Sequence, residues 1–374
     1  MCKKIVFLSG TRADFGKIKS LIQILENDIH FETFVFVTGM HLMETYGYTL
    51  IEIERCNFSN VHAIKNHTNE ATMDLTLAKT IEGFSNYVKN IQPDLIIVHG
   101  DRVEAMAGAI VGALNNILVA HIEGGELSGT VDGLIRHSVS KMSHIHYVSN
   151  KRAKKRLVQM GELSESIKVI GSPDVDIMFS KALPKIQEVK KYYEIPFDSY
   201  ALAMFHPVTT EFEKMEDYAH DFVEALLKDD KNYVIIFPNN DLGSEKIINA
   251  YSKLLNNSRF RIFPSVRFEY FLILLKNSSF IIGNSSAGIR EAPYYGIPTI
   301  NIGSRQENRS LHSHIVNVDY NSNDIFRALK SKLELIEKDH KTFGKGNSSQ
   351  LFLESLLEGS LWTLNTQKSF VDIH

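Results

Sequence analysis

The sequence predicts an α/β protein built from two Rossmann-like, doubly wound domains with a central cleft between them. The chain has 374 residues, which is too long for one ordinary core. Short apolar runs rich in β-branched residues alternate with stretches of helical spacing. The series of runs starts again near the middle of the chain, whereas an eight-fold barrel would not restart. We therefore expect one domain over residues 1–172 and a second over residues 173–348.

Six apolar runs predict the strands of the first half. Continuous apolar runs of this length are typical of parallel strands that are buried on both faces. The runs span residues 3–10, 31–39, 94–101, 116–124, 145–150 and 167–172. Residues 101–116 show helical spacing and contain small side chains, so this segment is expected to pack closely on the sheet.

A similar series of six runs predicts the strands of the second half. The runs span residues 200–207, 233–240, 260–266, 279–286, 298–303 and 314–319. We place the boundary between the domains near residues 173–185, after Ser172 and Pro173. The last helical stretch covers residues 349–368, and we expect the C-terminal segment, residues 349–374, to pack back on the first domain.

Composition and charge exclude several classes of protein. The residues are 44% hydrophobic and 23% charged, and the formal net charge is −3, so no basic field attracts nucleic acid or anionic membranes. The two cysteines, Cys2 and Cys56, exclude a disulfide framework and a cysteine-based zinc site. No apolar run reaches the roughly 18 residues of a membrane-spanning helix, and no signal sequence is apparent. These features predict a cytoplasmic protein without nucleic-acid or membrane partners.

Ligands of open α/β sheets bind at the carboxyl ends of strands, so the residues after each run are candidates for a site. The first run leads into SGTRADFGK (9–17), which lacks the GxGxxG pattern of a dinucleotide site. Arg12 lies where a guanidinium can bind a phosphate beside the free N–H groups of a helix terminus. The alternative is that Asp14 caps the helix and Arg12 is a surface charge.

Carboxylates follow the third and fourth runs. The third run ends in HGDR (99–102), where Asp101 is either a site carboxylate or the N-cap of the next helix. The fourth leads into HIEGGELSGTVDGLIRHSVSK (121–141), in which Glu123, Glu126 and Asp132 cluster around four glycines. Glycines let the backbone approach a ligand, and carboxylates at the edge of a sheet are available for acid–base chemistry.

Histidines are frequent in the same region, but their spacing does not match a compact metal-ligand set such as HExxH. We interpret them as hydrogen-bonded structural groups and expect neither a catalytic metal nor another cofactor. These residues are His99, His121, His137, His144 and His146.

Two strand ends of the second half are also polar. His206 follows an apolar strand and is expected to point toward the cleft, although a structural histidine satisfied by a backbone carbonyl is the alternative. The next strand leads into FPNNDLGSE (237–245), whose composition also suits a plain turn.

The segment IIGNSSAGIREAP (281–293) combines small residues with charges at the start of a helix. Ser285, Ser286 and Gly288 can present free N–H groups to an anion without bulky side chains in the way. Glu291, one turn later, can accept hydrogen bonds from ribose hydroxyls. This joint pattern favours a nucleotide diphosphate site over a plain N-cap at Ser285.

Together these segments resemble the UDP-N-acetylglucosamine 2-epimerase family, and specifically its hydrolysing branch in bacterial sialic acid synthesis. The resemblance covers nearly the whole chain. Besides residues 121–141, it is carried by GTRADFGK (10–17), IVHGDR (97–102), MFHPVTTE (204–211), FPNND (237–241), GNSSAGIREAP (283–293) and GSRQENR (303–309). It implies a two-domain glycosyltransferase B-like fold.

The resemblance also implies roles for individual residues. Asp101, Glu123 and Asp132 match the family's catalytic carboxylates, and His206 matches its cleft histidine. The residues expected around UDP, together with the loop glycine, are Arg12, Arg102, Asn239, Ser285, Ser286, Gly288, Glu291 and Arg305.

The implied reaction has two stages and needs no metal. UDP is eliminated from UDP-N-acetylglucosamine to leave 2-acetamidoglucal, and water then adds at carbon 1 while carbon 2 is reprotonated from the opposite face. The products are free N-acetylmannosamine and UDP. The resemblance also suggests a homo-oligomer, either a dimer or a tetramer. The division of tasks among the three carboxylates stays open at this point.

One loop separates this chain from the non-hydrolysing epimerases. Those enzymes typically show an alanine-glycine-leucine-arginine run after the first glutamate, whereas this chain reads EGGELSGTVDG (123–133), which favours release of a free sugar. Three alternatives remain. The first is a hydrolysing epimerase of a UDP- or GDP-linked 2,4-diacetamido-trideoxyhexose in the legionaminic acid pathway. The second is a glycosyltransferase of the same fold, and the third is a nucleotide-sugar sensor without catalysis.

Overall fold

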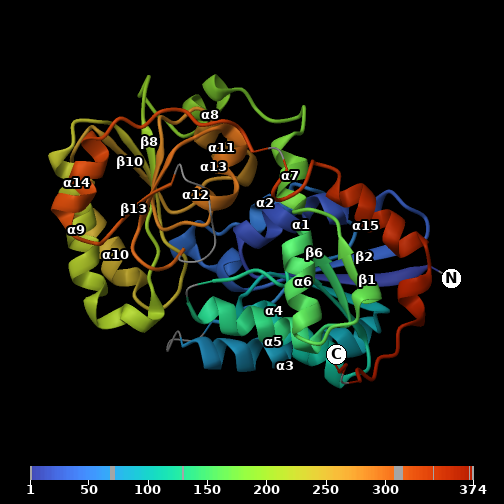
Figure 1. Ribbon diagram of the computed structural model, residues 1–374. Coiled ribbons are helices and arrows are strands. Elements are labelled where there is room, and N and C mark those ends of the chain that lie inside the picture. Colours follow the sequence, from blue (N-terminus) through green and yellow to red (C-terminus); the bar gives the residue numbers. More distant parts are fainter. Residues whose placement is uncertain are drawn as a thin grey trace. The chain divides into compact units, whose positions relative to one another are not determined.

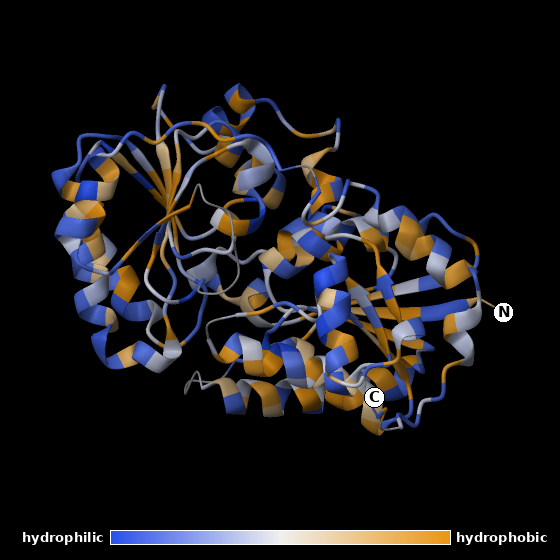
Figure 2. Cartoon of the chain, viewed as in Figure 1, coloured by the Kyte–Doolittle hydropathy of each residue, from blue (hydrophilic) through white to orange (hydrophobic). Residues whose placement is uncertain are grey.

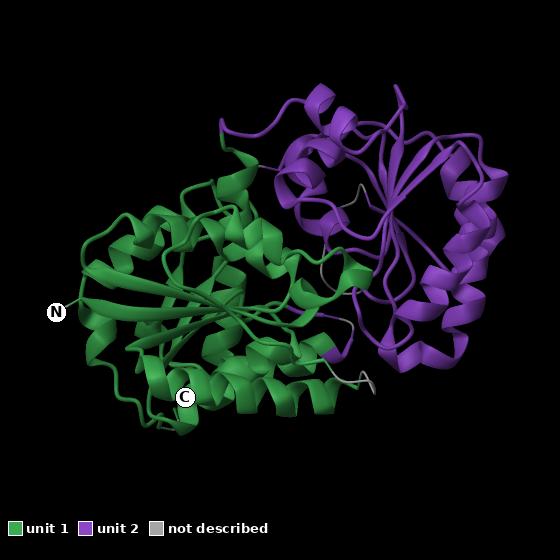
Figure 3. Cartoon of the chain, turned by 180° about the vertical axis from the view of Figure 1, so that it is seen from behind, with its two compact units in different colours: residues 1–126, 132–180, 341–374 green, residues 127–131, 181–340 purple. Residues whose placement is uncertain are grey.

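The computed structural model describes residues 2–67, 72–128, 130–306, 315–339, 341–369 and 371–372 (Figure 1). The chain divides into two compact units (Figure 3). Unit 1 comprises Met1–Glu126, Asp132–Ser180 and Lys341–His374, and unit 2 comprises Leu127–Val131 and Lys181–His340. Each unit contains one parallel sheet with helices, so the predicted α/β fold class with two parallel-sheet domains is confirmed.

The chain passes from unit 1 to unit 2 after Ser180, which lies within the predicted boundary region of residues 173–185 but later than the predicted domain limit at residues 172 and 173. The difference arises because helix α7 (Pro173–Met178) packs against helices of unit 1. Residues 341–348 likewise belong to unit 1, ahead of the expected C-terminal segment.

Unit 1 contains a seven-stranded parallel sheet with the order β3-β2-β1-β4-β5-β6-β7. Its strands are β1 (Lys3–Ser9), β2 (Phe31–Val37), β3 (Val61–Ala63), β4 (Leu95–His99), β5 (Leu118–Ile122), β6 (Ile145–Val148) and β7 (Ile167–Val169). Six of these coincide with the predicted runs. The short β3 was not predicted, because its three residues are largely exposed and carry no apolar run.

Helices cover both faces of this sheet (Figure 1). The helices are α1 (Arg12–Glu26), α2 (Leu50–Glu54), α3 (Met73–Ile91), α4 (Val103–Leu114), α5 (Val131–Met142), α6 (Lys151–Gln159), α7 and α15 (Ser348–Leu357). The described residues also form the short 3-10 helices η1 (Gly39–Leu42), η2 (Glu44–Tyr46), η3 (Ser164–Ser166) and η6 (Ser360–Thr363).

Alternate residues of each strand pack on opposite layers of unit 1. Phe7 belongs to the core cluster shared with α1 and α15, and its ring lies 6.5 Å from that of Phe352. On the other face, α4 packs so closely that a Cβ at Gly108 would lie 2.6 Å from the side chain of Val98. The small residues of the predicted helix therefore do permit close packing on the sheet.

Unit 2 contains a six-stranded parallel sheet with the order β10-β9-β8-β11-β12-β13. Its strands are β8 (Ala201–Met204), β9 (Tyr233–Ile236), β10 (Phe260–Phe263), β11 (Ile281–Gly283), β12 (Thr299–Ile302) and β13 (Ile315–Val318). All six fall within the predicted runs. The strands of both sheets carry mostly hydrophobic residues (Figure 2), as burial on two faces requires.

The helices of unit 2 are α8 (Ile186–Tyr192), α9 (Met215–Lys228), α10 (Ser244–Tyr251), α11 (Phe268–Lys276), α12 (Ala287–Arg290), α13 (Ala292–Tyr295) and α14 (Ser322–Lys330), with 3-10 helices η4 (Thr209–Lys214) and η5 (Ser252–Leu254). The core joins α9, α10 and α14 to one face of the sheet, where Phe205 stacks on Phe222. Among the described residues, no helix is both long and apolar enough to cross a membrane.

The strand order of each sheet reverses beside the first strand of its unit, β1 in unit 1 and β8 in unit 2. In unit 1, β1 pairs with β2 on one side and β4 on the other, and in unit 2, β8 pairs with β9 and β11. Loops that leave two neighbouring strands at such a switch point diverge and leave room for a ligand. The candidate residues of each unit follow these strands.

Candidate functional site

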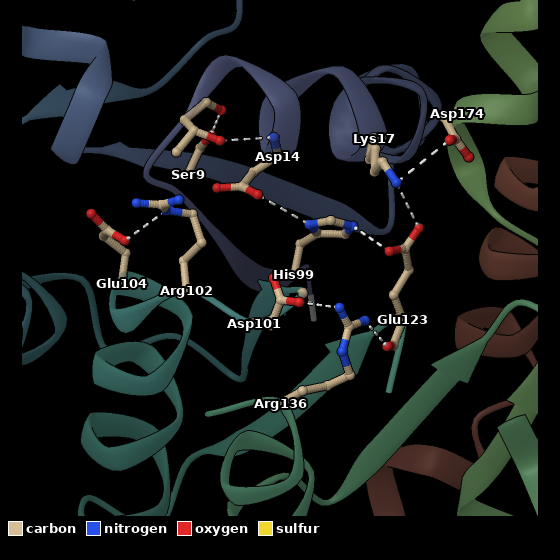
Figure 4. Close-up of polar contacts among 12 residues, drawn as sticks. Ser9, Asp14, Lys17, His99, Asp101, Arg102, Glu104, Glu123, Arg136 and Asp174 are labelled. Carbon is tan, nitrogen blue, oxygen red and sulfur yellow. Dashed lines mark hydrogen bonds and ion pairs between the residues drawn. The ribbon is translucent and has the colours of Figure 1, made fainter. Parts of the chain in front are cut away.

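In unit 1, charged residues gather at the carboxyl ends of β1, β4 and β5 (Figure 4). These three strands are neighbours in the sheet, so the loops after them meet at one edge. Asp14 comes from the first turn of α1, Asp101 follows β4, and Glu123 follows β5. The fold thus brings together the segments that the sequence analysis selected.

Glu123 is the most enclosed of the predicted carboxylates. Its backbone has a positive φ of 66°, and the residue is 3% exposed. Oε1 accepts hydrogen bonds from Ser172 Oγ at 2.8 Å and from Lys17 Nζ at 3.1 Å. Lys17 Nζ also lies 3.6 Å from Asp174 Oδ2. The charge of Glu123 is therefore balanced by partners that come from distant parts of the chain.

His99, the last residue of β4, lies beside the same carboxylate. Its Nε2 is 3.5 Å from Glu123 Oε2, and its Nδ1 is 3.4 Å from Asp14 Oδ1. Burial alone would lower the pKa of His99, but the charge of Glu123 and the hydrogen bond with Asp14 outweigh it and raise the pKa to about 9. The raised pKa favours the imidazolium form of the ring at neutral pH.

Arg136 of α5 connects two of the predicted positions. One guanidinium nitrogen pairs with the carboxylate of Asp101, and the other donates to the backbone oxygen of Glu123 at 2.9 Å. Asp101 does not cap α4, whose N-cap is Arg102. Asp132 lies in the first turn of α5, four residues before Arg136, and is partly exposed. One helix therefore carries both a predicted carboxylate and the cation that orients another.

Arg12 begins α1, and the cap of this helix is Thr11 rather than Asp14. The Thr11 Oγ1 accepts from the Asp14 N–H at 3.1 Å, which leaves the Asp14 carboxylate available to His99. Arg12 itself is partly exposed at this helix terminus, where a phosphate would find free N–H donors.

Glu104 is a buried carboxyl that the sequence analysis did not select. It is 1% exposed, and its Oε2 lies 3.6 Å from Nε of Arg102. A Cβ at Gly10 would lie 2.8 Å from this side chain, so the loop after β1 has room for Glu104 only because residue 10 is glycine. Burial raises the pKa of Glu104. The signal available in the sequence was its position three residues after Asp101.

His121 and His146 are structural groups, as the sequence analysis interpreted them. His121 Nε2 donates to the Gly100 oxygen at 2.8 Å, and its Nδ1 lies 3.0 Å from Ser140 Oγ, while burial lowers its pKa to about 3. His146 Nε2 lies 3.0 Å from Glu162 Oε2 in a fully buried pair. Across the described part of the chain, no group of three or more His, Cys, Asp or Glu side chains is arranged to bind a metal ion.

In unit 2, the buried Asn284 after β11 organises the equivalent edge. Its Oδ1 accepts from the backbone N–H of His206 at 2.6 Å, and its Nδ2 donates to the His206 oxygen at 2.8 Å. Its backbone oxygen accepts from Gln306 Nε2 at 2.8 Å and from Arg305 at 3.2 Å. The sequence analysis quoted Asn284 within a motif but did not select it.

His206 and Asn239 meet across β8 and β9. The Asn239 N–H donates to His206 Nδ1 at 3.0 Å, so this ring nitrogen accepts and carries no proton. The side-chain amide of Asn239 donates to the carboxylate of Asp241. At Nδ1, His206 is thus oriented by a backbone N–H donor.

The small-residue loop after β11 opens only a short helix. Ser285 Oγ accepts from the Ala287 N–H at 3.3 Å, and α12 then spans four residues. At Gly288 a Cβ would lie 2.6 Å from the side chain of Thr299, so close packing on β12 accounts for this glycine. Glu291 follows α12 and is 4% exposed. The rest of the motif 303–309 beyond residue 306 lies outside the described residues.

The chain is similar over nearly its whole length to known epimerases. A profile of the family described as UDP-N-acetylglucosamine 2-epimerase matches residues 23–357. The chain is 48% identical over 377 residues to the UDP-N-acetylglucosamine 2-epimerase of Neisseria meningitidis serogroup B, with 100% of each chain covered. It is 32% identical over 355 residues to the UDP-N,N'-diacetylbacillosamine 2-epimerase (hydrolyzing) of Legionella pneumophila, with 94% of each covered.

A solved structure shows the same fold. The UDP-GlcNAc 2-epimerase of Methanocaldococcus jannaschii, in complex with UDP-GlcNAc and UDP, matches with a TM-score of 0.81. The match covers 95% of this chain and 100% of that chain at 22% identity. This likeness confirms the predicted glycosyltransferase B-like fold class.

Proposed function

Because the chain belongs to the UDP-N-acetylglucosamine 2-epimerase family, we propose that it is a hydrolysing epimerase that converts UDP-N-acetylglucosamine and water into N-acetylmannosamine and UDP. The observation that carries this proposal is the convergence of Asp101 and Glu123 on Arg136 at one edge of unit 1. A sensor would need the phosphate-binding residues but not these carboxylates. Similarity at 48% identity over 100% of both chains favours this sugar over other substrates.

The first stage is an elimination. A carboxylate accepts the proton from carbon 2 while the bond between carbon 1 and the diphosphate oxygen breaks, and its electron pair leaves with UDP. The carbon–hydrogen electrons form the double bond of 2-acetamidoglucal. The proton on carbon 2 is weakly acidic, so the base must be positioned as cleavage advances. Asp101, with a side chain 23% exposed, and the partly exposed Asp132 are the carboxylates most accessible to a sugar.

The second stage is a hydration. Water adds its oxygen to carbon 1, a carboxylate accepts the proton that water loses, and a carboxylic acid donates a proton to carbon 2 from the opposite face. The acid on this face carries a proton from solvent, and the base of the first stage releases its proton to solvent, so the two stages together consume one water. Stabilisation of the charge on the leaving diphosphate falls to cationic and N–H donors.

We assign binding of the UDP portion to the residues that the sequence motifs selected for it. Arg12 and Arg102 are cations at the edge of unit 1. In unit 2, the guanidinium of Arg305 donates a hydrogen bond to the backbone oxygen of Asn284. The backbone around Ser285 and Ser286 offers N–H donors, and the fixed His206 and Asn239 are neighbours at the same edge. We keep Glu291 and Gly288 as candidates, although Gly288 also has the packing role described above.

Reaction in heavy water tests the proposal. The protein is incubated with UDP-N-acetylglucosamine without added metal, and products are followed by proton NMR. We expect UDP and free N-acetylmannosamine carrying deuterium at carbon 2. UDP-N-acetylmannosamine as the product would place the chain in the non-hydrolysing branch, and an unchanged sugar would contradict this substrate.

A second candidate substrate is a nucleotide-linked 2,4-diacetamido-trideoxyhexose. The specific observation in its favour is the 32% identity to the Legionella enzyme over 94% of each chain. The same NMR assay with UDP-N,N'-diacetylbacillosamine distinguishes the two. We expect this sugar to turn over more slowly than UDP-N-acetylglucosamine, and faster turnover would reverse the ranking.

We further propose a role in sialic acid synthesis and a homo-oligomeric state. The support is the free amino sugar that the reaction would release and the resemblance stated for the motifs. Sedimentation of the purified protein tests the second point, and a monomer at micromolar concentration would contradict it.

A further inference from the structure

His99 lies between the carboxylates of Asp14 and Glu123 (Figure 4), and the proposed chemistry gives this histidine no role. Nδ1 is 3.4 Å from Asp14 Oδ1, and Nε2 is 3.5 Å from Glu123 Oε2. The residue is 6% exposed, so bulk water does not screen these charges. The three side chains come from α1, β4 and the end of β5, which are separate segments that the sheet brings together.

Only a charged ring suits this position. A neutral imidazole has one N–H and one lone pair, whereas both nitrogens of His99 face carboxylate oxygens. Loss of one proton would direct a lone pair at a buried carboxylate, where repulsion is poorly screened. His121 provides the contrast, because one of its nitrogens faces a carbonyl and the other a hydroxyl, which a neutral ring satisfies.

Charged groups surround the triad of Asp14, His99 and Glu123 from every neighbouring element. The other charged or titratable residues of this neighbourhood are Arg12 and Lys17 on α1, His41 on η1, Asp101 and Arg102 after β4, Glu104 on α4, His121 on β5, Arg136 on α5 and Asp174 on α7. Lys17 and Ser172 donate hydrogen bonds to Oε1 of Glu123, whereas Nε2 of His99 lies beside Oε2. The two oxygens thus have different partners.

We propose that His99 is a positioning residue whose imidazolium, oriented by Asp14, fixes the carboxylate of Glu123 and thereby sets the alkaline limit of turnover. The inference rests on the proposed function, in which Glu123 is one of the carboxylates of the reaction. Asp14 acts on Glu123 only through His99, because the charge of Asp14 keeps the ring protonated. The relation resembles other carboxylate–histidine pairs in which the outer carboxylate fixes the state of the ring.

Histidine NMR tests the protonation without any substrate. The ring signals of wild-type protein are titrated, and the His99 signal is assigned as the one missing in His99→Gln. We expect its midpoint near pH 9 in the wild type, since the pKa of His99 is raised to about 9. In Asp14→Asn, which removes the charge but keeps an acceptor, the midpoint should fall by about one pH unit or more.

Kinetics test the consequence for turnover. In the wild type, kcat should decline as pH rises through the His99 midpoint, and in Asp14→Asn this decline should move to lower pH together with the NMR midpoint. His99→Gln retains an N–H donor for Glu123 but does not titrate. We expect this variant to have a lower kcat, reduced about tenfold or more, and to lack the alkaline decline.

The surface pair of Asp28 and His30 gives a matched control. His30 Nδ1 lies 2.8 Å from Asp28 Oδ1, but the pair is exposed and lies outside the site. Asp28→Asn should leave the pH profile of kcat and the His99 midpoint unchanged.

Two results would overturn the inference. One is a wild-type His99 midpoint at or below the ordinary value of about 6.5. The other is an Asp14→Asn variant whose NMR midpoint and alkaline decline stay at the wild-type pH. Failure of the proposed function is distinguishable, because a wild type that does not convert UDP-N-acetylglucosamine would still show the predicted NMR titration.

Discussion

The carboxyl-end edges of the two sheets have related topology but different chemistry. In unit 1 the edge is charged, with Asp14, His99, Glu123 and Lys17 in close contact. In unit 2 the equivalent edge is organised by the neutral amide of Asn284, which forms hydrogen bonds with both the backbone N–H and the backbone oxygen of His206. Strand order alone therefore does not determine the chemistry, because the loops supply it.

The difference suggests a division of labour. Buried charges that balance one another can accept and return protons, and they are costly to maintain unless each has its partner. Amide and backbone donors keep their state over a wide pH range and suit the recognition of a constant ligand such as UDP. We therefore propose that unit 1 supplies the groups for proton transfer, while the neutral donors of unit 2 contribute to binding.

The largest expected effect comes from neutralising one charge of unit 1. Glu123→Gln should lower kcat for N-acetylmannosamine formation by at least about 100-fold, because a neutral amide cannot take part in proton transfer. The heavy-water NMR assay measures the rate. Glu54→Gln, at an exposed position of α2, is the matched control and should be indistinguishable from the wild type. Wild-type turnover in Glu123→Gln would remove the catalytic role of unit 1 from the account.

A smaller effect is expected from the amide of unit 2. Asn284→Ala leaves the N–H and oxygen of His206 without their partner, and this should lower the free energy of unfolding by about 1–3 kcal/mol. Denaturant unfolding followed by circular dichroism measures it. Asn301→Ala removes an Asn–Asn hydrogen bond of 2.8 Å in the same sheet and controls for loss of an amide. If Asn284→Ala were as stable as the wild type, Asn284 would not organise this edge.

The smallest effect concerns acid stability, and it belongs to unit 1. Burial lowers the pKa of His41 to about 4 and that of His121 to about 3, so both are neutral in the folded state. In the unfolded chain they bind protons below about pH 6.5, and the unfolded state then holds more protons than the native state. Their contribution to stability is fully present above pH 6.5 and is lost as pH falls toward 4 and 3.

Trp362 makes this loss measurable for unit 1. It is the one tryptophan of the chain and lies in η6, with its Nε1 donating to the Leu356 oxygen at 2.9 Å. Urea unfolding followed by its fluorescence should give a lower free energy of unfolding at pH 5 than at pH 7. His41→Asn should show a weaker dependence, because an amide can bond Ser9 and Thr49 without titrating. An equal dependence in variant and wild type would contradict the assignment to His41.

The sequence predicted most strands of the two sheets correctly, because continuous apolar runs indicate burial on both faces of a strand. It missed β3, whose residues are largely exposed. It located Asp101 and Glu123, because each directly follows such a run. It did not reveal that Arg136 joins them, or that His99 faces Asp14, since these contacts link residues 35 and 85 positions apart.

Two glycines also show that the sequence does not reveal contacts between distant segments. The sequence favoured a ligand as the reason for Gly288, and the structure adds a second reason, because the residue packs against Thr299 of a neighbouring strand. Gly10 is explained by the buried Glu104 beside it, which periodicity could not indicate. In both cases the structural reason is a contact distant in sequence, which only the assembled sheet defines.

Calorimetric titration of UDP into Glu123→Gln and Asn284→Ala, side by side with the wild type, tests the division of labour most directly. We expect Glu123→Gln to bind UDP within about threefold of the wild type, whereas Asn284→Ala, still folded, should bind it about tenfold or more weakly, as expected for loss of about 1.4 kcal/mol. Weakened UDP binding in Glu123→Gln together with unchanged binding in Asn284→Ala would contradict it.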